Sequence, residues 1–216
     1  MLIVEKQPKS IPAESYRSLR TNIQYSSFDK EVKRILVTSS EPGEGKTTTV
    51  INLALAFSQD EKKVIVVDCD LRKPSVHKQF RISNNIGLSD VVIDNSKLKK
   101  AINKYNEYLD ILPSGKVPPN PSELLGSKAM ENLLDELEKE YDIIIIDTPP
   151  VQAVTDSQIL STKVDGVILV VRAERTKKDS VKLAKAALEK VNAHILGVVL
   201  NGEERTRSKY YYYYSE

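Results

Sequence analysis

Short aliphatic runs alternate with longer amphipathic stretches along most of the chain. Runs without polar alternation are typical of parallel strands that are buried on both faces. Helices that cover such a sheet carry apolar residues at three- and four-residue intervals. The pattern predicts an α/β fold of the doubly wound type, with a mostly parallel sheet and helices on both faces. The predicted strands are residues 35–37, 64–67, 109–112, 143–146, 167–171 and 195–200, and the predicted helices are residues 47–58, 128–140 and 177–191.

The segments around this alternating core have their own patterns. Residues 13–25 show no strand alternation and predict an N-terminal helix that starts near Pro12 and spans about residues 12–26. Residues 113–126 hold four prolines and two glycines, which predicts an ordered but irregular surface loop beside the ligand crevice. The polar, aperiodic sequence near the C-terminus predicts one domain over residues 1–204 and a flexible tail over 205–216.

Size and composition narrow the class of protein. A chain of 216 residues with 40% hydrophobic residues suits a single domain with a substantial core. Its 32 basic and 30 acidic residues are interspersed, which argues against nucleic acid as a partner. The single cysteine, Cys69, excludes an internal disulfide and is expected to pack in the core. The absence of an internal disulfide and of a signal-peptide pattern near the N-terminus predicts a cytoplasmic protein. No aliphatic run approaches the roughly 20 residues of a membrane-spanning helix, so we expect any membrane association to come through a partner.

One motif indicates nucleotide binding. Residues 40–47 read Ser-Glu-Pro-Gly-Glu-Gly-Lys-Thr, the phosphate-loop pattern with serine in place of the first glycine. The motif lies between a predicted strand and a predicted helix, so an ordinary glycine-containing turn is the weaker alternative. Lys46 is expected to contact the terminal phosphates and Thr47 to ligate Mg²⁺. The predicted nucleotide-binding residues of the loop are Gly43, Glu44, Gly45, Lys46, Thr47 and Thr48.

Carboxylates follow two of the predicted strands. One apolar run ends in Asp68 and, two positions later, Asp70, and alternation places both side chains on the same face of the extended chain. Another apolar run ends in Asp147, followed by Thr-Pro-Pro, which has the form of a Walker B strand. Strand ends beside a phosphate loop face the ligand crevice. We therefore expect three carboxylates at one metal–nucleotide site, although a solvated strand-end residue would explain each one alone.

Five consecutive tyrosines, Tyr210, Tyr211, Tyr212, Tyr213 and Tyr214, stand almost at the C-terminus. They fit neither helical nor strand patterning, because a run of identical side chains points to every face. An aromatic edge strand or an interaction segment would explain them in isolation. Beside a nucleotide site, they also suit the role of phosphate acceptors.

Together these motifs resemble those of the bacterial tyrosine kinases, the P-loop family that governs capsule and exopolysaccharide production. The similarity covers essentially the whole chain. It is carried by the phosphate loop, the strand end Asp68-Cys-Asp-Leu-Arg72, the strand end Asp147 and the tyrosine cluster. Glu14, Arg17 and Arg20 also resemble the family's glutamate and paired-arginine motif for subunit contact. Spacings of three place these charges on one broad helix face, which suits ion pairing across an interface or, alternatively, solvation.

The resemblance implies a tyrosine kinase that uses ATP and Mg²⁺. It assigns catalysis to Lys46, Asp68, Asp70 and Asp147, with Asp68 as the base that accepts the tyrosine proton. Asp70 and Asp147, with Thr47, would hold magnesium or its waters, but spacing alone does not assign these roles. Asn201 resembles the base-contacting asparagine of related ATPases, although a turn residue at a strand end fits almost as well.

The resemblance also implies partners. Autophosphorylation of the tyrosine cluster would occur between subunits of a ring-like homo-oligomer, and each phosphate would add about −1.5 to −2 charges that expel the tail and loosen the ring. Arg205, Arg207 and Lys209 would either steer the tail or keep it soluble. A membrane adaptor, expected as a separate chain, would recruit the kinase to the inner face of the cell membrane. A protein-tyrosine phosphatase is a further expected partner.

Two other functions compete with the kinase interpretation. Nucleotide-switch ATPases of the partitioning and division-site type carry a signature lysine five positions before the loop lysine, where this chain has Glu41. They also lack a tyrosine tail. A non-enzymatic interaction module would bind nucleotide only structurally, and three carboxylates at strand ends argue against it.

Overall fold

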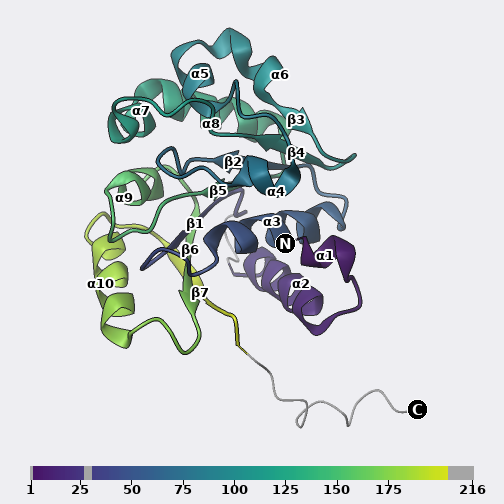
Figure 1. Ribbon diagram of the computed structural model, residues 1–216, viewed down its shortest axis with the longest axis vertical. Helices are drawn as coiled ribbons and strands as arrows, with labels where there is room; N and C mark the ends of the chain where they lie inside the picture. Colours follow the sequence, from purple (N-terminus) through teal and green to yellow (C-terminus); the bar gives the residue numbers. More distant parts are fainter. Residues whose placement is uncertain (1, 27–30, 204–216) are drawn as a thin grey trace.

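A seven-stranded sheet forms the centre of the molecule (Figure 1). The computed structural model describes residues 2–26 and 31–203. The strand order is β3-β4-β2-β5-β1-β6-β7, and each pair is parallel except the antiparallel β3–β4 pair. The strands are β1 (Arg34–Ser39), β2 (Val64–Asp68), β3 (Asn103–Lys104), β4 (Leu109–Leu112), β5 (Ile143–Asp147), β6 (Gly166–Arg172) and β7 (Ile195–Asn201).

Helices cover both faces of the sheet and create two apolar cores. One face packs against α1 (Ile3–Lys6), α2 (Ile11–Gln24), α3 (Lys46–Ser58) and α4 (Val76–Phe80). The other packs against α5 (Leu88–Ile93), α6 (Leu98–Ala101), α7 (Pro121–Gly126), α8 (Lys128–Glu140), α9 (Asp156–Ser161) and α10 (Lys178–Glu189), and a 3₁₀ turn, η1 (Asn95–Lys97), precedes α6. Helix α3 is buried along almost its whole length because α2 covers its outer side.

The structure confirms the predicted architecture and each predicted strand. The predicted helices appear as α2, α3, α8 and α10, within a few residues of their expected ends. Ser10 caps α2 by accepting a hydrogen bond from the Ala13 N–H at 3.3 Å, and Pro12 lies in its first turn. Cys69 is fully buried, as expected. Among the described residues, no helix is long and apolar enough to cross a membrane.

One local prediction is wrong. The segment 113–126 was expected to be irregular throughout, but its last six residues form α7. Asn120 precedes Pro121 at the helix start, where a proline's missing N–H costs nothing because that position has no helical acceptor. Leu125 then anchors the helix in the core with no exposed surface. Proline content therefore marked a helix start here and not an absence of helix.

The predicted site residues lie together at the carboxyl ends of the central strands β2, β5 and β1. The phosphate loop follows β1, Asp68 ends β2 and Asp147 ends β5, and the last two are direct register partners on neighbouring strands. This is the edge at which doubly wound sheets bind ligands.

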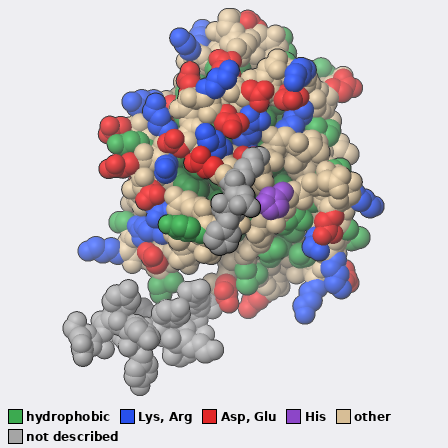
Figure 2. Space-filling model, turned by 180° about the vertical axis from the view of Figure 1, so that it is seen from behind, with side chains coloured by type: hydrophobic (Ala, Val, Ile, Leu, Met, Phe, Trp, Pro, Cys, Tyr) green, Lys and Arg blue, Asp and Glu red, His purple; other side chains and the backbone are tan. Residues whose placement is uncertain are grey.

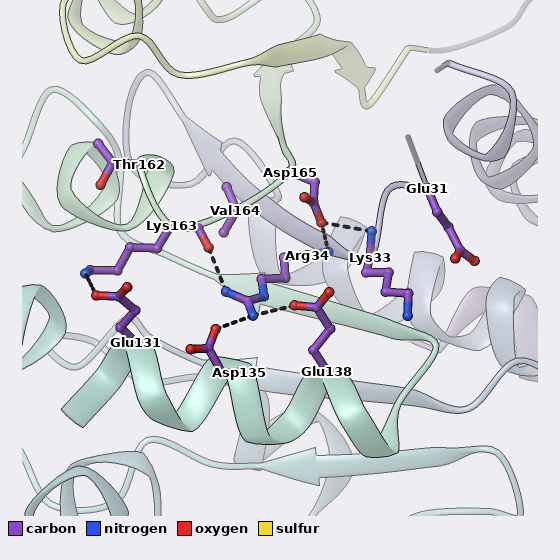
Figure 3. A pocket seen from close by; sticks show the side chains of 10 residues that line it. All are labelled: Glu31, Lys33, Arg34, Glu131, Asp135, Glu138, Thr162, Lys163, Val164 and Asp165. Atoms are coloured by element: carbon purple, nitrogen blue, oxygen red, sulfur yellow. Dashed lines mark hydrogen bonds and ion pairs between the residues drawn. The ribbon is translucent and has the colours of Figure 1, made fainter. Parts of the chain in front are cut away.

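The amino ends of the strands carry a cavity of about 650 Å³ (Figure 3). There the Arg34 guanidinium lies between Asp135, at 2.7 Å, and Glu138, both on α8. Lys163 meets Glu131 at 3.5 Å, and Asp165 accepts hydrogen bonds from the N–H groups of Lys33 and Arg34. The ion pairs that line this cavity join β1 to α8. They lie at the amino ends of the strands, opposite the phosphate loop. On the face seen in Figure 2, acidic and basic side chains are intermingled over much of the surface.

Candidate active site

The phosphate loop turns through two glycines in the left-handed region. Gly43 has φ +80° and Gly45 has φ +100°, conformations that other residues adopt only with strain. A Cβ atom on Gly45 would also lie 1.9 Å from the side-chain nitrogen of Asn201, so only glycine fits. Lys46 begins α3, which places the loop at the positive end of a 13-residue helix.

Glu44 braces the loop from within. Its side chain is 1% exposed and accepts hydrogen bonds from the Ser40 hydroxyl at 3.0 Å, the Glu41 N–H at 2.9 Å and the Thr176 hydroxyl. The Glu44 carbonyl accepts a further hydrogen bond from the Asn201 side-chain amide at 2.8 Å. Glu44 and Asn201 thus tie the phosphate loop to the ends of β6 and β7. Sequence reasoning placed both residues at the nucleotide site but did not predict this bracing contact.

The magnesium-binding candidates meet at the start of α3. The Thr47 hydroxyl donates to an oxygen of Asp147 at 2.6 Å and lies 2.9 Å from the Ser75 hydroxyl. Asp147 is completely buried, and its other oxygen, Oδ1, has no hydrogen-bond partner among the described residues. A buried carboxylate oxygen without a partner is costly, so this geometry favours an additional cationic ligand at that point.

Asp68 organises the loop that follows β2. Its carboxylate is fully buried and accepts hydrogen bonds from three backbone N–H groups: Asp70 at 3.2 Å, Ser75 at 3.2 Å and Val76 at 3.1 Å. Asp70 also stabilises this loop, because its carboxylate accepts a hydrogen bond from the Lys73 N–H at 3.0 Å. The two aspartates therefore shape the segment that carries them.

The electrostatics of the site follow from this crowding. Burial raises the pKa of Asp68 well above its ordinary value, and the negative charges of Asp147 and Asp70 raise it further. Burial also raises the pKa of Asp147, to about 7, although Lys46 and the Thr47 hydrogen bond oppose the shift. Two carboxylates side by side under low dielectric retain a proton or attract a cation. The site thus favours a divalent ion electrostatically.

The donor set fits magnesium if phosphate and water complete it. Among residues 2–26 and 31–203, no group of three or more His, Cys, Asp or Glu side chains has the geometry of a metal site. A hydroxyl and one or two carboxylates, with the remaining ligands from water and nucleotide phosphate, are what Mg²⁺ commonly uses. Thr47 and Asp147 supply this minimal set directly, and Asp70 contributes to the charge around them.

Comparisons with known proteins show the family to which the chain belongs. A family profile described as an AAA domain matches residues 32–196, which supports nucleotide binding. The tyrosine-protein kinase YwqD of Bacillus subtilis is 44% identical over 214 residues, covering 99% of this chain and 90% of the relative. The chain belongs to the bacterial tyrosine kinase family.

Two solved structures support the same assignment. The kinase domain of the Escherichia coli tyrosine kinase Etk superposes with a TM-score of 0.91 at 33% identity, covering 98% of this kinase and 83% of that chain. A chimeric protein, CapA2B2, superposes with a TM-score of 0.88 at 45% identity, covering 92% and 88%. The similarity therefore extends over the fold as a whole.

The kinase carries its predicted subunit-contact residues on α2, with unequal exposure. The Glu14 side chain is 69% exposed and pairs with Arg17 at 3.0 Å, and Arg17 is 28% exposed. Arg20 is only 18% exposed, because it donates to the Ala56 carbonyl at 3.0 Å and pairs with Asp60 at 3.3 Å. Glu14 and Arg17 therefore present the surface charge, while Arg20 mainly joins α2 to the end of α3. The predicted phosphate acceptors, Tyr210 to Tyr214, and the neighbouring Arg205, Arg207 and Lys209 lie outside the described residues.

Proposed function

We propose that this kinase transfers the terminal phosphoryl group of ATP, in a Mg²⁺-dependent reaction, to the tyrosines Tyr210 to Tyr214 of a neighbouring subunit. The observation that carries the ATP–Mg²⁺ requirement is the Thr47–Asp147 contact at 2.6 Å, with the second, unpartnered oxygen of Asp147 buried beside it. Bound at this point, magnesium would neutralise charge on the phosphates. The kinase names of the relatives support the choice of tyrosine as the acceptor class.

The residues of the site suit an in-line transfer. A phenol has a pKa of about 10 and is a weak nucleophile until a positioned base accepts its proton. In the proposed step, the tyrosine oxygen bonds to the terminal phosphorus, the bond from that phosphorus to the bridging oxygen breaks, and Asp68 takes the phenolic proton. Burial makes Asp68 a better proton acceptor than an exposed aspartate, because it raises the pKa of the carboxyl. Lys46, which is 9% exposed at the first position of α3, would stabilise charge on the transferred group.

Assembly and regulation complete the proposal. The exposed Glu14 and the half-buried Arg17 on α2 would pair with a neighbouring copy in a ring-like oligomer, so that one subunit's tail enters the next subunit's crevice. The chimeric relative CapA2B2 supports an adaptor partner. We infer that this adaptor is a separate chain and that it recruits the kinase to the inner face of the membrane. We place the activity in the control of capsule or exopolysaccharide synthesis, with a tyrosine phosphatase reversing the modification.

The test is incubation with labelled ATP and Mg²⁺, followed by mapping of the label onto individual residues. Lys46→Met should abolish incorporation, whereas Lys182→Met, at a side chain that is 78% exposed, should not. Replacing all five tail tyrosines with phenylalanine should remove most self-labelling but spare labelling of an added tyrosine substrate. Label found only as free inorganic phosphate would favour a nucleotide-switch ATPase and overturn the proposal.

A further inference from the structure

A buried carboxylate outside the predicted catalytic set stands next to the loop that follows β2. Asp156 begins α9 and has no exposed surface. Arg72 binds it with two nitrogens, Nε to Oδ2 at 2.9 Å and Nη2 to Oδ1 at 3.1 Å. Ser122 of α7 donates to the same Oδ1 at 2.6 Å and accepts from Arg72 at 3.2 Å. We call Arg72, Ser122 and Asp156 the Arg72 cluster; its three members come from three segments far apart in sequence.

The location of the Arg72 cluster says more about its role than its contribution to stability does. Only one partner is buried, since Asp156 has no exposed surface while the Arg72 side chain is 39% exposed, and ion pairs of either kind are weak evidence for stability. Stability alone therefore does not explain why an aspartate stands at this buried position. A bidentate contact to arginine fixes direction as well as distance, which makes it suited to holding a loop in one conformation.

The loop that Arg72 anchors carries parts of the proposed active site. Arg72 lies two residues after Asp70 and four after Asp68. Three residues further on, Ser75 donates its N–H to Asp68 at 3.2 Å, and its hydroxyl lies 2.9 Å from that of Thr47. The same short loop thus contacts the proposed base and the proposed magnesium ligand, and Asp156 binds it through Arg72.

We propose that Asp156 is a positioning residue for phosphoryl transfer, acting through Arg72. By holding the loop between Asp70 and Ser75, it keeps Asp68 and Asp70 in register with Thr47 on α3. The inference rests on the proposed roles of Asp68 and Asp70 but adds two residues that neither the phosphate loop nor the strand-end carboxylates include. Because Ser122 belongs to α7, it also ties the proline-containing segment to the conformation of this loop.

A purely structural connection between α7 and α9 is the competing explanation, since these helices pack against each other. Such a connection would affect thermal stability alone. A positioning role would lower turnover in protein that is still folded and still binds nucleotide, because the phosphate loop itself is unchanged. The two explanations therefore differ in the kinetic constants they predict.

The experiment compares the phosphorylation kinetics of Arg72→Met, Arg72→Lys and Asp156→Asn with those of the wild-type kinase, each as the full 216-residue chain. For Arg72→Met and Asp156→Asn we expect kcat to fall about 10- to 100-fold, as small misplacements of reacting groups do, while KM for ATP stays within about threefold. Arg72→Lys keeps the charge but loses the bidentate contact, so it should recover only part of the activity. The Arg72→Met and Asp156→Asn effects should not add in the double variant, because both remove one interaction.

Arg34→Met is the matched control. Arg34 is likewise paired with carboxylates, although its side chain is 13% exposed against 39% for Arg72, and it lies at the opposite edge of the sheet. It should lower the melting temperature and leave kcat unchanged. A folded Arg72→Met protein with wild-type kcat, or additive effects in the double variant, would overturn the positioning role.

A binding measurement separates this inference from the proposed function. Displacement of Asp70 should raise the Mg²⁺ concentration needed for half-maximal binding of a fluorescent ATP analogue in Arg72→Met, with Mg²⁺-free binding unchanged. If wild-type protein labelled no tyrosine at all, the proposed function would fail, and this Mg²⁺ dependence would still decide whether Arg72 positions the loop. An unchanged Mg²⁺ requirement in Arg72→Met would count against it.

Discussion

At the scale of single residues, the site is defined by charges that are buried before any ligand arrives. Asp147 has no exposed surface, one oxygen bound to Thr47 and one oxygen without a partner among the described residues. Its neighbour in register, Asp68, is equally buried. Such an arrangement costs folding free energy in the empty protein, and binding of a cation recovers it. Strain of this electrostatic kind is common where a site must attract its ligand.

The first prediction concerns Asp147 and pH. Because its pKa in the folded state is raised to about 7 from 3.8, its contribution to stability is fully present below about pH 4 and is lost as pH rises through about 7. Asp147→Asn cannot ionise, so without magnesium and nucleotide its melting temperature should exceed that of the wild type increasingly from pH 5 to pH 8. By pH 8 we expect a gap of more than about 3 °C.

Differential scanning fluorimetry at a series of pH values provides the measurement. Asp179→Asn, at a side chain that is 88% exposed, serves as the control. Magnesium with an ATP analogue should raise the wild-type melting temperature at pH 8 far more than that of Asp147→Asn. A gap between wild type and Asp147→Asn that stays constant across the pH range would contradict the electrostatic account.

Single residues also mark the limit of what the sequence could predict about the site. Lys46, Thr47, Asp68 and Asp147 could be placed together because the phosphate loop and two strand ends with carboxylates must share one edge of a parallel sheet. The bracing role of Glu44 could not, because its partner Thr176 is 132 residues away and only the fold brings the two together. The Arg72–Asp156 contact, 84 residues apart, was unpredictable for the same reason.

At the scale of elements, prediction succeeded where one signal dominated. The central strands β2 and β5 begin as continuous aliphatic runs that are buried on both faces, and few other structures accept four consecutive isoleucines such as those of β5. The short helices could not be predicted from the spacing of apolar residues, because a six-residue helix such as α7 or α9 spans less than two turns and shows no clear period. The two-residue strand β3 forms only because β4 is already there to pair with.

The contact between α2 and α3 carries the second prediction. Arg20 satisfies the Ala56 carbonyl near the end of α3 and pairs with Asp60, so it holds the two helices together. Arg20→Met should therefore lower the free energy of unfolding by about 1–3 kcal/mol, as loss of hydrogen bonds to a charged group does. Urea denaturation followed by circular dichroism would measure it.

Glu14→Ala is the control for this comparison. Glu14 lies on the same helix, but its side chain is 69% exposed, so the expected change is within about 0.5 kcal/mol. Equal stability of Arg20→Met and Glu14→Ala would show that Arg20 does not join the helices. This result matters for assembly, because it determines which variants of α2 can be used to test subunit contact.

At the scale of the whole molecule, the proposed activities are separated in space. Nucleotide and metal chemistry belong to the carboxyl edge of the sheet, and the ion-pair network around Arg34 belongs to the amino edge. Helix α2 lies outside α3, on one flank of the sheet, and α3 begins at the phosphate loop. A neighbour bound to α2 would therefore stand one helix away from the phosphate loop.

The last prediction tests this assembly with the residues that the structure leaves available. Because Arg20 is engaged within the chain, replacing Glu14, Arg17 and Arg20 together would confuse loss of contact with loss of stability. Glu14 and Arg17 line the same depression of about 280 Å³ on α2. The double change Glu14→Ala and Arg17→Ala removes their charges and spares the contact of Arg20 to α3. We expect it to convert oligomers to monomers, because it removes the charges that are proposed to pair with the neighbouring copy. Each subunit should stay folded, because a surface ion pair of this kind adds little to the stability of one subunit.

Light scattering coupled to size exclusion should show this conversion, with a melting temperature close to that of the wild type. Labelling of the tail should then become dependent on protein concentration, since a tyrosine must reach another molecule by diffusion and not within a preformed ring. Lys182→Ala with Lys185→Ala on α10 provides a matched pair of exposed changes away from α2. Intact oligomers of the α2 variant would remove this face from the interface, and concentration-independent labelling by its monomers would mean that the tail reaches its own subunit's crevice.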